Sequence, residues 1–217
     1  MAQPSPRSFD LLGTQTRGAL LLADISGYTG FLQGVADAHR SIVIEADEPP
    51  AAYALMSSLL DRIVTAIEPH FHLAKLEGDA VFARSRDDHA LRGAEVLACL
   101  RACYASFAER LAEANSIWTC RCDSCSRVGG LDLKFVLHHG EFVVQRIAGS
   151  EEVLGPDVIT VHRLLKNHVR EVIGARPYAL VTDTALAALD IPSEGMTAIA
   201  ETYDQIPTIA AHVLALA

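Results

Sequence analysis

The segment that most constrains the fold is LLLADISGYTGFL, residues 20–32, in which an apolar run ends at a carboxylate and a turn. Residues 20–23 contain no polar side chain, which is typical of a central strand buried on both faces. Asp24 closes this strand, and because an unpaired carboxylate in an apolar interior is costly, it requires a cation, hydrogen-bond donors or water. Ser26 and Gly27 then turn the chain into a helical pattern, and backbone N–H groups at such a turn suit an anionic ligand. The alternative is that Asp24 only caps the helix that follows.

A second carboxylate stands in KLEGDAVF, residues 75–82. Gly78 permits a tight hairpin, and Asp79 leaves that hairpin at the start of a strand. If the hairpin lies beside the first strand, Asp24 and Asp79 converge at one edge of the sheet. Two carboxylates together with substrate phosphates commonly hold Mg²⁺, and a two-metal site activates a hydroxyl and neutralises a transferring phosphoryl group. The pair therefore predicts a site for Mg²⁺ or Mn²⁺ with two ions.

The remaining periodicity predicts a mixed α+β architecture. Helices are expected at residues 28–38, 51–67, 86–114, 157–167 and 184–189, and strands at 20–24, 70–76, 80–83, 131–137, 141–147, 178–182, 197–203 and 208–215, the last with a helical alternative. This order predicts an α/β sandwich with helices on one face of a mixed sheet.

Length and composition narrow the class of protein. With 217 residues, half of them hydrophobic, the chain can bury one sizeable core, and we expect a single domain over residues 18–217 after a flexible lead over residues 1–17. A net charge of −9 argues against a nucleic-acid surface, which would need a basic face. No apolar run approaches the roughly 20 residues of a membrane span, and the first residues lack the apolar core of a signal peptide. These features predict a cytoplasmic protein that binds neither nucleic acid nor membrane.

Four motifs occur in an order that resembles one known family. DISGYT, KLEGDAVFA, LHHGEFV and VLGPDVITVHRL follow one another as they do in class III nucleotidyl cyclases, over about residues 18–167. More narrowly, the chain is similar to a little-characterised bacterial branch with EGDAVF, a CxCxxC insert and VHRLLKN. The resemblance implies a ferredoxin-like α/β sandwich that works as a homodimer in signal transduction. It implies conversion of a nucleoside triphosphate into a 3′,5′-cyclic nucleotide and pyrophosphate.

The resemblance also assigns roles to the residues already singled out. Asp24 and Asp79 match the two metal-binding aspartates, and the Ile25 carbonyl matches an additional metal ligand. Ser26 and Gly27 fall where the nucleotide binds.

Three more residues match the half of the family's site that comes from the opposite subunit. Lys75 matches the lysine that reads the adenine edge, so ATP is the expected substrate and cyclic AMP the expected product. Glu152 falls where those enzymes carry an aspartate that helps to read the base, and Arg163 matches the arginine that stabilises the phosphoryl transition state. His162 and His168 flank that arginine and are either core or interface histidines or phosphate contacts.

Two departures from the family favour an alternative function. The family's transition-state asparagine is replaced by Ile159, which has no hydrogen-bonding group, although Thr160 beside it could partly compensate. Removing one such donor costs about 10²–10³ in rate. No lysine follows Lys166, so the family's late triphosphate lysine would be replaced by an arginine, by His212 or by nothing. The alternative is a catalytically degenerate module that binds a nucleotide or regulates a partner without turnover.

The insert at residues 116–130 carries three thiols, Cys120, Cys122 and Cys125. This spacing is compatible with a structural Zn²⁺, which takes four Cys or His ligands, so that one ligand must come from elsewhere. The candidates for it are Cys103, His138, His139 or a residue of a partner subunit. A redox or disulfide pair and plain packing remain as alternatives.

Overall fold

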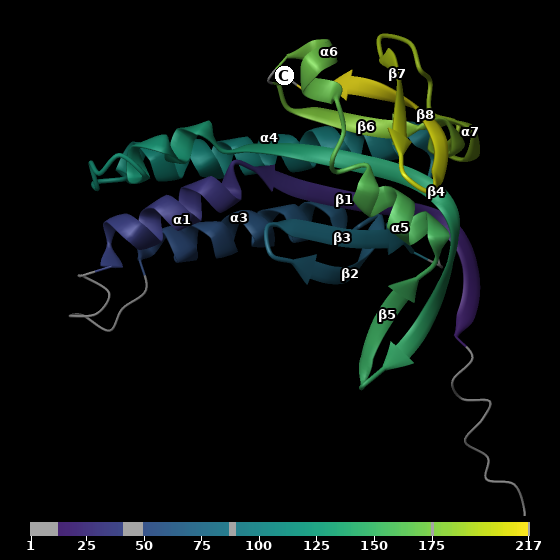
Figure 1. Cartoon of the computed structure of the whole chain (residues 1–217), viewed down its shortest axis with the longest axis horizontal. Coiled ribbons are helices and arrows are strands. Elements are labelled where there is room, and N and C mark those ends of the chain that lie inside the picture. The colour runs from purple at the N-terminus through teal and green to yellow at the C-terminus, as the bar shows by residue number, and fades with distance from the viewer. Residues whose placement is uncertain (1–12, 41–49, 87–89, 175, 217) are drawn as a thin grey trace, which may run out of the picture.

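The computed structural model describes residues 13–40, 50–86, 90–174 and 176–216. The helices and strands follow in the order β1 (Thr14–Ser26), α1 (Tyr28–Ala38), α3 (Ala51–Ile67), β2 (Phe71–Glu77), β3 (Ala80–Ser85), α4 (Gly93–Ile117), β4 (Asp132–Ile147), β5 (Ser150–Leu154), α5 (Pro156–Arg163), α6 (Val169–Ile173), β6 (Tyr178–Thr182), α7 (Asp183–Leu189), β7 (Thr197–Tyr203) and β8 (Ile206–Ala215), as Figure 1 shows. A 3₁₀ helix, Cys125–Gly130, lies between α4 and β4.

A single sheet of eight strands organises the described chain. Its order is β2-β3-β1-β4-β6-β8-β7, with β5 pairing to β4 off this path. β1 lies between β3 and β4 and is antiparallel to both, whereas β4 and β6 run parallel. The sheet is therefore mixed, and the predicted α+β class is confirmed.

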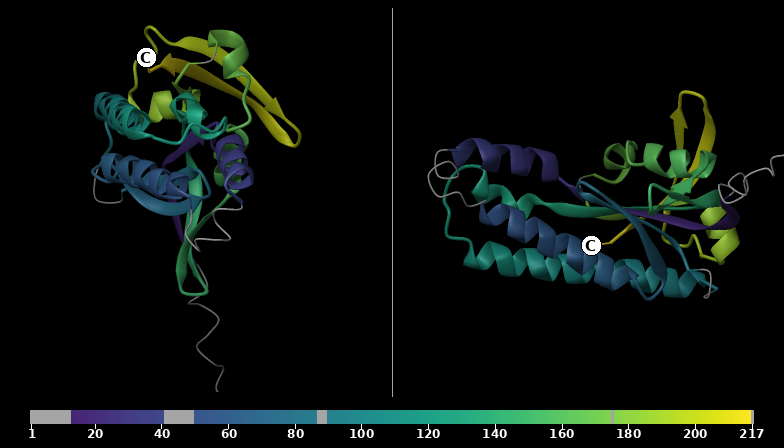
Figure 2. Two further views of the ribbon diagram at one scale, coloured as in Figure 1. Left: turned by 90° about the vertical axis from the view of Figure 1, so that its left-hand side faces the viewer. Right: turned by 90° about the horizontal axis from the view of Figure 1, so that it is seen from below.

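The central strand β1 is buried on both faces, as its apolar run predicted. Because side chains alternate along a strand, Leu21 and Ala23 enter one core with the buried faces of α3 and α4. Leu20 and Leu22 enter a second core with buried residues of α5 and α6. The long helices α3 and α4 lie side by side (Figure 2). The short helices α5 and α6 cover part of the opposite face, so the expectation of helices on one face only is wrong.

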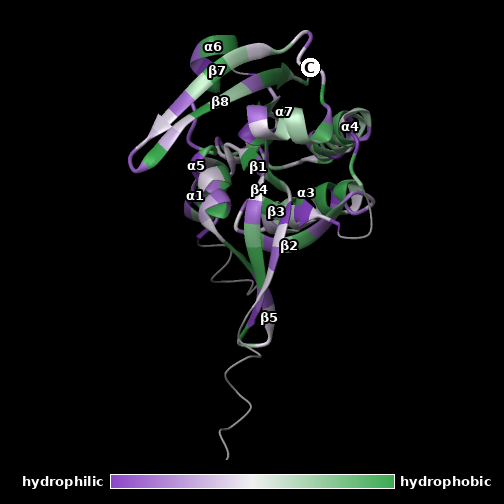
Figure 3. Cartoon of the chain, turned by 90° about the vertical axis from the view of Figure 1, so that its right-hand side faces the viewer, coloured by the Kyte–Doolittle hydropathy of each residue, from purple (hydrophilic) through white to green (hydrophobic). Residues whose placement is uncertain are grey.

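Several boundaries differ from the sequence expectation. Residues 131–147 do not form two strands: β4 runs unbroken through Gly140, which pairs with Gly18 of β1. β1 already begins at Thr14, so residues 14–17 belong to the sheet rather than to a lead, and residues 1–12 lie outside the described part. Two elements were not expected, namely β5, which extends away from the body with β4 (Figure 3), and α6. Among the described residues, no helix is both long and apolar enough to cross a membrane.

Candidate functional site

Asp24 and Asp79 line one cleft. The cleft measures about 370 Å³ and is lined by residues 24–30 together with Asp79, Lys134, Leu165, Asn167, Arg170 and Tyr178. Asp24 lies near the end of β1, and the backbone N–H of Ile25 donates to the Asp79 carbonyl at 3.2 Å. The β2–β3 hairpin thus lies beside β1, as the sequence argument required, and brings its carboxylate to the end of the central strand.

A lysine that sequence analysis did not single out balances part of this charge. Lys134 stands opposite Asp24 in the β1–β4 register, and its Nζ lies 3.0 Å from Asp24 Oδ2 and 3.3 Å from the Leu165 carbonyl oxygen. The two side chains are 20% and 15% exposed, so this ion pair is largely shielded from water. Burial, followed by the charge of Asp24, raises the pKa of Asp79. The Lys134 ammonium therefore faces two carboxylates, and the Arg170 side chain also lines the cleft.

The turn after Asp24 offers donors to the same cleft. Gly27 adopts φ 88°, a conformation that favours glycine, and forms the N-cap of α1. No side chain among the described residues caps this helix, so the interpretation of Asp24 as a helix cap is wrong: its carboxylate is bound to Lys134 instead. The first residues of α1, Tyr28 to Gly30, line the cleft beside Asp24. A helix N-terminus directed at a cleft favours an anion.

The residues matched to the family's other half-site lie elsewhere. Lys75 Nζ is 3.4 Å from Glu152 Oε2, and this ion pair connects β2 to β5. Arg163 ends α5, where it is exposed and forms no ion pair with a described residue. None of these three lines the cleft that holds Asp24 and Asp79.

The structure shows the surroundings of Ile159 and Thr160, the residues of α5 at and beside the position of the family asparagine. Ile159 is 58% exposed, so the position of the family asparagine presents an apolar side chain to the surface. Thr160 is 9% exposed, and its hydroxyl donates to the Pro156 carbonyl at 3.1 Å.

The histidines that follow on the chain are engaged by carboxylates. His162 Nε2 lies 2.9 Å from Glu77 Oε2, and its Nδ1 lies 2.7 Å from the Val158 carbonyl oxygen. His168 contacts Glu201 through both its backbone N–H and its ring, and the hydrogen bond to this fully buried carboxylate raises the pKa of His168. These contacts favour the structural interpretation of both residues.

The place of the late lysine is not taken by His212. Its Nδ1 lies 3.0 Å from Asp183 Oδ1, and the residue does not line the cleft. Arg170 of α6 does line it, so an arginine is the available second cation.

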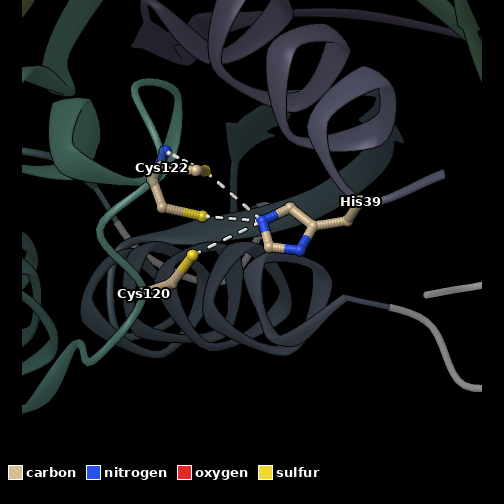
Figure 4. A group of neighbouring side chains, drawn as sticks. His39, Cys120 and Cys122 are labelled. Carbon is tan, nitrogen blue, oxygen red and sulfur yellow. Dashed lines mark hydrogen bonds between the residues drawn. The ribbon is translucent and has the colours of Figure 1, made fainter. Parts of the chain in front are cut away.

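The cysteines of the insert lie close to His39, a residue that the sequence did not single out. The ligand atoms of His39, Cys120, Cys122 and Cys125 all lie within 4.8 Å of one another, and Figure 4 shows sulfurs of the insert pointing at the His39 ring. The sequence candidates for a fourth ligand within this chain are wrong. Cys103 is buried against α3, His138 bonds Thr182 Oγ1 at 3.0 Å and Asp157 Oδ1 at 3.1 Å, and His139 is not in the group. All five cysteines are free thiols, so the disulfide alternative is not what the structure contains.

The fold defines a structural class. Over 95% of its length the chain matches all of the guanylyl cyclase Cya2, with a TM-score of 0.64 and 18% identity. It matches the adenylyl cyclase CyaB from P. aeruginosa over 93% of its own length and 96% of that chain, with a TM-score of 0.64 and 12% identity. The chain has the fold of class III nucleotidyl cyclase domains.

The sequence relatives are more specific. Residues 56–172 match the family described as "Protein of unknown function (DUF2652)", and the chain belongs to this family. It is also 32% identical over 165 residues to the "Uncharacterized protein Rv2561/Rv2562" of Mycobacterium tuberculosis (strain ATCC 25618 / H37Rv), across 75% of this chain and 74% of that protein.

Proposed function

We propose that the protein is a nucleotidyl cyclase that converts a nucleoside triphosphate, with ATP as the expected substrate, into the 3′,5′-cyclic nucleotide and pyrophosphate. The observation that carries the proposal is the convergence of Asp24 and Asp79 in one cleft of a cyclase fold. Two carboxylates in one cleft, next to a helix N-terminus, suit a cation that carries phosphates.

The residues of the cleft fit a divalent cation. The carboxylates of Asp24 and Asp79 are hard oxygen ligands, and the Lys134 ammonium already rests against one of them, where positive charge is favoured. With this lysine present, the protein side suits one ion, and the second ion of the expected pair would arrive with the triphosphate. When bound, Mg²⁺ or Mn²⁺ would lower the pKa of the attacking hydroxyl and neutralise phosphate charge.

The chain's own groups would orient the nucleotide around that centre. The N–H groups at Ser26, Gly27 and the first turn of α1 would bind phosphate oxygens, assisted by Arg170. The ribose 3′-oxygen would attack the α-phosphorus in line, the bond to the β-phosphate would break, and the hydroxyl proton would leave to water.

A second copy of the chain would complete the site. Lys75 and Glu152 form a donor–acceptor pair that complements the edge of a purine, and they stand outside the cleft of their own protomer together with Arg163. A two-fold dimer would place each such set over the other protomer's cleft. The Arg163 guanidinium would then stabilise charge on the transferring phosphoryl group.

The test is product formation. Purified protein incubated with ATP, GTP, CTP or UTP and Mn²⁺ or Mg²⁺ should yield a cyclic nucleotide, identified by mass spectrometry, with ATP the best substrate. Asp24→Ala should abolish the product, whereas Asp37→Ala, an exposed aspartate of α1 paired with Arg40, should not. Equal turnover by the Asp24→Ala chain would contradict the proposal.

A second candidate is favoured by the surface of α5. The exposed Ile159 and the internally bonded Thr160 leave no neutral hydrogen-bond donor at the place of the family asparagine. A module that binds a nucleotide without turnover would bind ATP and Mn²⁺ in calorimetry, lose binding with Asp24→Ala and return the ATP unchanged. Ile159→Asn would then be the substitution most expected to restore product.

A further inference from the structure

Three thiols surround one imidazole nitrogen at the end of α1. His39 Nε2 lies 3.5 Å from Cys120 Sγ, 3.4 Å from Cys122 Sγ and 3.4 Å from Cys125 Sγ. His39 is the C-cap of α1, and the cysteines come from the insert between α4 and β4. Figure 4 shows Cys120 and Cys122 converging on the same ring nitrogen.

Hydrogen bonding does not account for this arrangement. A ring nitrogen of neutral imidazole has either one proton or one lone pair, so it can engage only one of the three thiols at a time. A shared ion does account for it. With Zn–S near 2.3 Å and Zn–N near 2.0 Å at tetrahedral angles, each sulfur would lie about 3.5 Å from the nitrogen. The three observed distances agree with that value.

We propose that His39, Cys120, Cys122 and Cys125 bind one Zn²⁺ in a closed Cys₃His site. Three thiolates and one imidazole form a soft ligand set of the kind that structural zinc takes, and four protein ligands leave no position open for a substrate. The backbone N–H of Cys125 donates to Cys122 Sγ at 3.3 Å, so one thiolate already has a supporting donor. The site is independent of the proposed nucleotide chemistry.

The position of this site at the end of α1 indicates that a bound ion would anchor that helix to the insert. α1 lies close against the insert, because a Cβ added at Gly34 would meet Ser124 Oγ. The same helix starts at Gly27, and its first turn lines the cleft of Asp24. Zinc at His39 would therefore anchor the far end of the helix whose near end faces the proposed nucleotide. Loss of the ion should loosen α1 and lower the stability of the whole domain.

Metal analysis tests the site directly. Full-length protein purified without added metal or chelator should contain about one zinc per chain by inductively coupled plasma mass spectrometry. His39→Ala and Cys122→Ser should lose most of it. His139→Ala and Cys99→Ala are the matched controls and should keep it, because these residues lie outside the group. Full zinc content in His39→Ala would overturn the assignment of the fourth ligand.

A rescue variant keeps the proposal testable if the loss variants fold poorly. His39→Cys creates a Cys₄ set, another common structural zinc site, and should retain zinc where His39→Ala loses it. Loading each protein with Co²⁺ should give thiolate-to-metal charge-transfer absorption, stronger in His39→Cys because a fourth thiolate is added. Wild-type protein without zinc and without this absorption would overturn the proposal.

Hydrogen exchange tests the anchoring role. Stripping the ion with a chelator should speed amide exchange in α1 more than in α3, and adding Zn²⁺ should reverse the change. Unchanged exchange in α1 after verified zinc loss would overturn the anchoring role.

Discussion

Replacing Lys134 by methionine should tighten the binding of a divalent cation in the cleft. Lys134 Nζ holds Asp24 Oδ2 at 3.0 Å, so an ion bound to that carboxylate would meet a competing positive charge. Methionine keeps most of the length of the side chain and removes the charge.

The distances at Asp24 determine how much Lys134→Met should change the affinity for a divalent cation. An ion about 2.1 Å from the carboxylate oxygen would lie up to about 5 Å from the ammonium. Even at the dielectric constant of bulk water, the repulsion between charges of +2 and +1 at about 5 Å is about 1.7 kcal/mol, so the affinity should increase at least about 15-fold. Without metal, the variant leaves Asp24 without the ion pair that Lys134 supplies. Breaking a fully buried pair costs about 3–5 kcal/mol, and partial exposure reduces this to about 2 kcal/mol, or about 4–8 °C in melting temperature.

Calorimetric titration of Mn²⁺ into nucleotide-free protein measures the affinity. Arg146→Met is the matched control, since it removes a cation from the same strand β4, about 40 Å along it from Lys134. That control should bind Mn²⁺ as the wild type does. Unchanged or weaker binding by Lys134→Met would refute the placement of the ion at Asp24.

Three further outcomes follow from the site. Asp79→Asn should raise the melting temperature of the metal-free protein at neutral pH, because the raised pKa of Asp79 means that its ionised form destabilises the fold. The gain should vanish when the pH falls below the ordinary pKa of a carboxyl group. A lower melting temperature at neutral pH would contradict the pKa argument. Mixing inactive Asp79→Ala and Arg163→Ala chains should restore part of the cyclase activity, whereas inactive heterodimers would mean that the site is built within one chain. The raised pKa of His168 contributes stability that is complete below the ordinary histidine pKa of about 6.5 and is lost as pH rises through the raised pKa. The melting temperatures of the wild type and of His168→Gln should therefore approach each other as the pH rises. A difference that stays constant with pH would argue against the ion pair with Glu201.

Local sequence patterns predicted most of the elements and the position of Asp24 and Asp79 in one cleft. Residues 20–23 indicated a doubly buried strand, and a hairpin at Gly78 beside that strand was expected to bring Asp79 to the same edge as Asp24. The break at Gly140 was misleading, since a glycine there ordinarily indicates a turn. Position 140 lies within β4 and pairs with Gly18, and a glycine is needed there because the Asp157 side chain occupies the space that a Cβ would need.

The residues that sequence analysis missed depend on contacts between distant segments. Lys134 reaches Asp24 only through the register of β1 and β4, which local periodicity does not fix. A lone lysine among the apolar residues of LKFVL, residues 133–137, was the available signal. His39 reaches the cysteines because α1 ends beside the insert, and no ligand spacing in the sequence marks it.

The most direct measurement is an anomalous-difference map from crystals grown with Mn²⁺ and 3′-deoxy-ATP, which cannot cyclise. The account predicts a manganese peak between the carboxylates of Asp24 and Asp79, with the triphosphate against Gly27 and the adenine near Lys75 of a second protomer. A manganese–nucleotide complex bound elsewhere, with Lys134 still alone against Asp24, would contradict it.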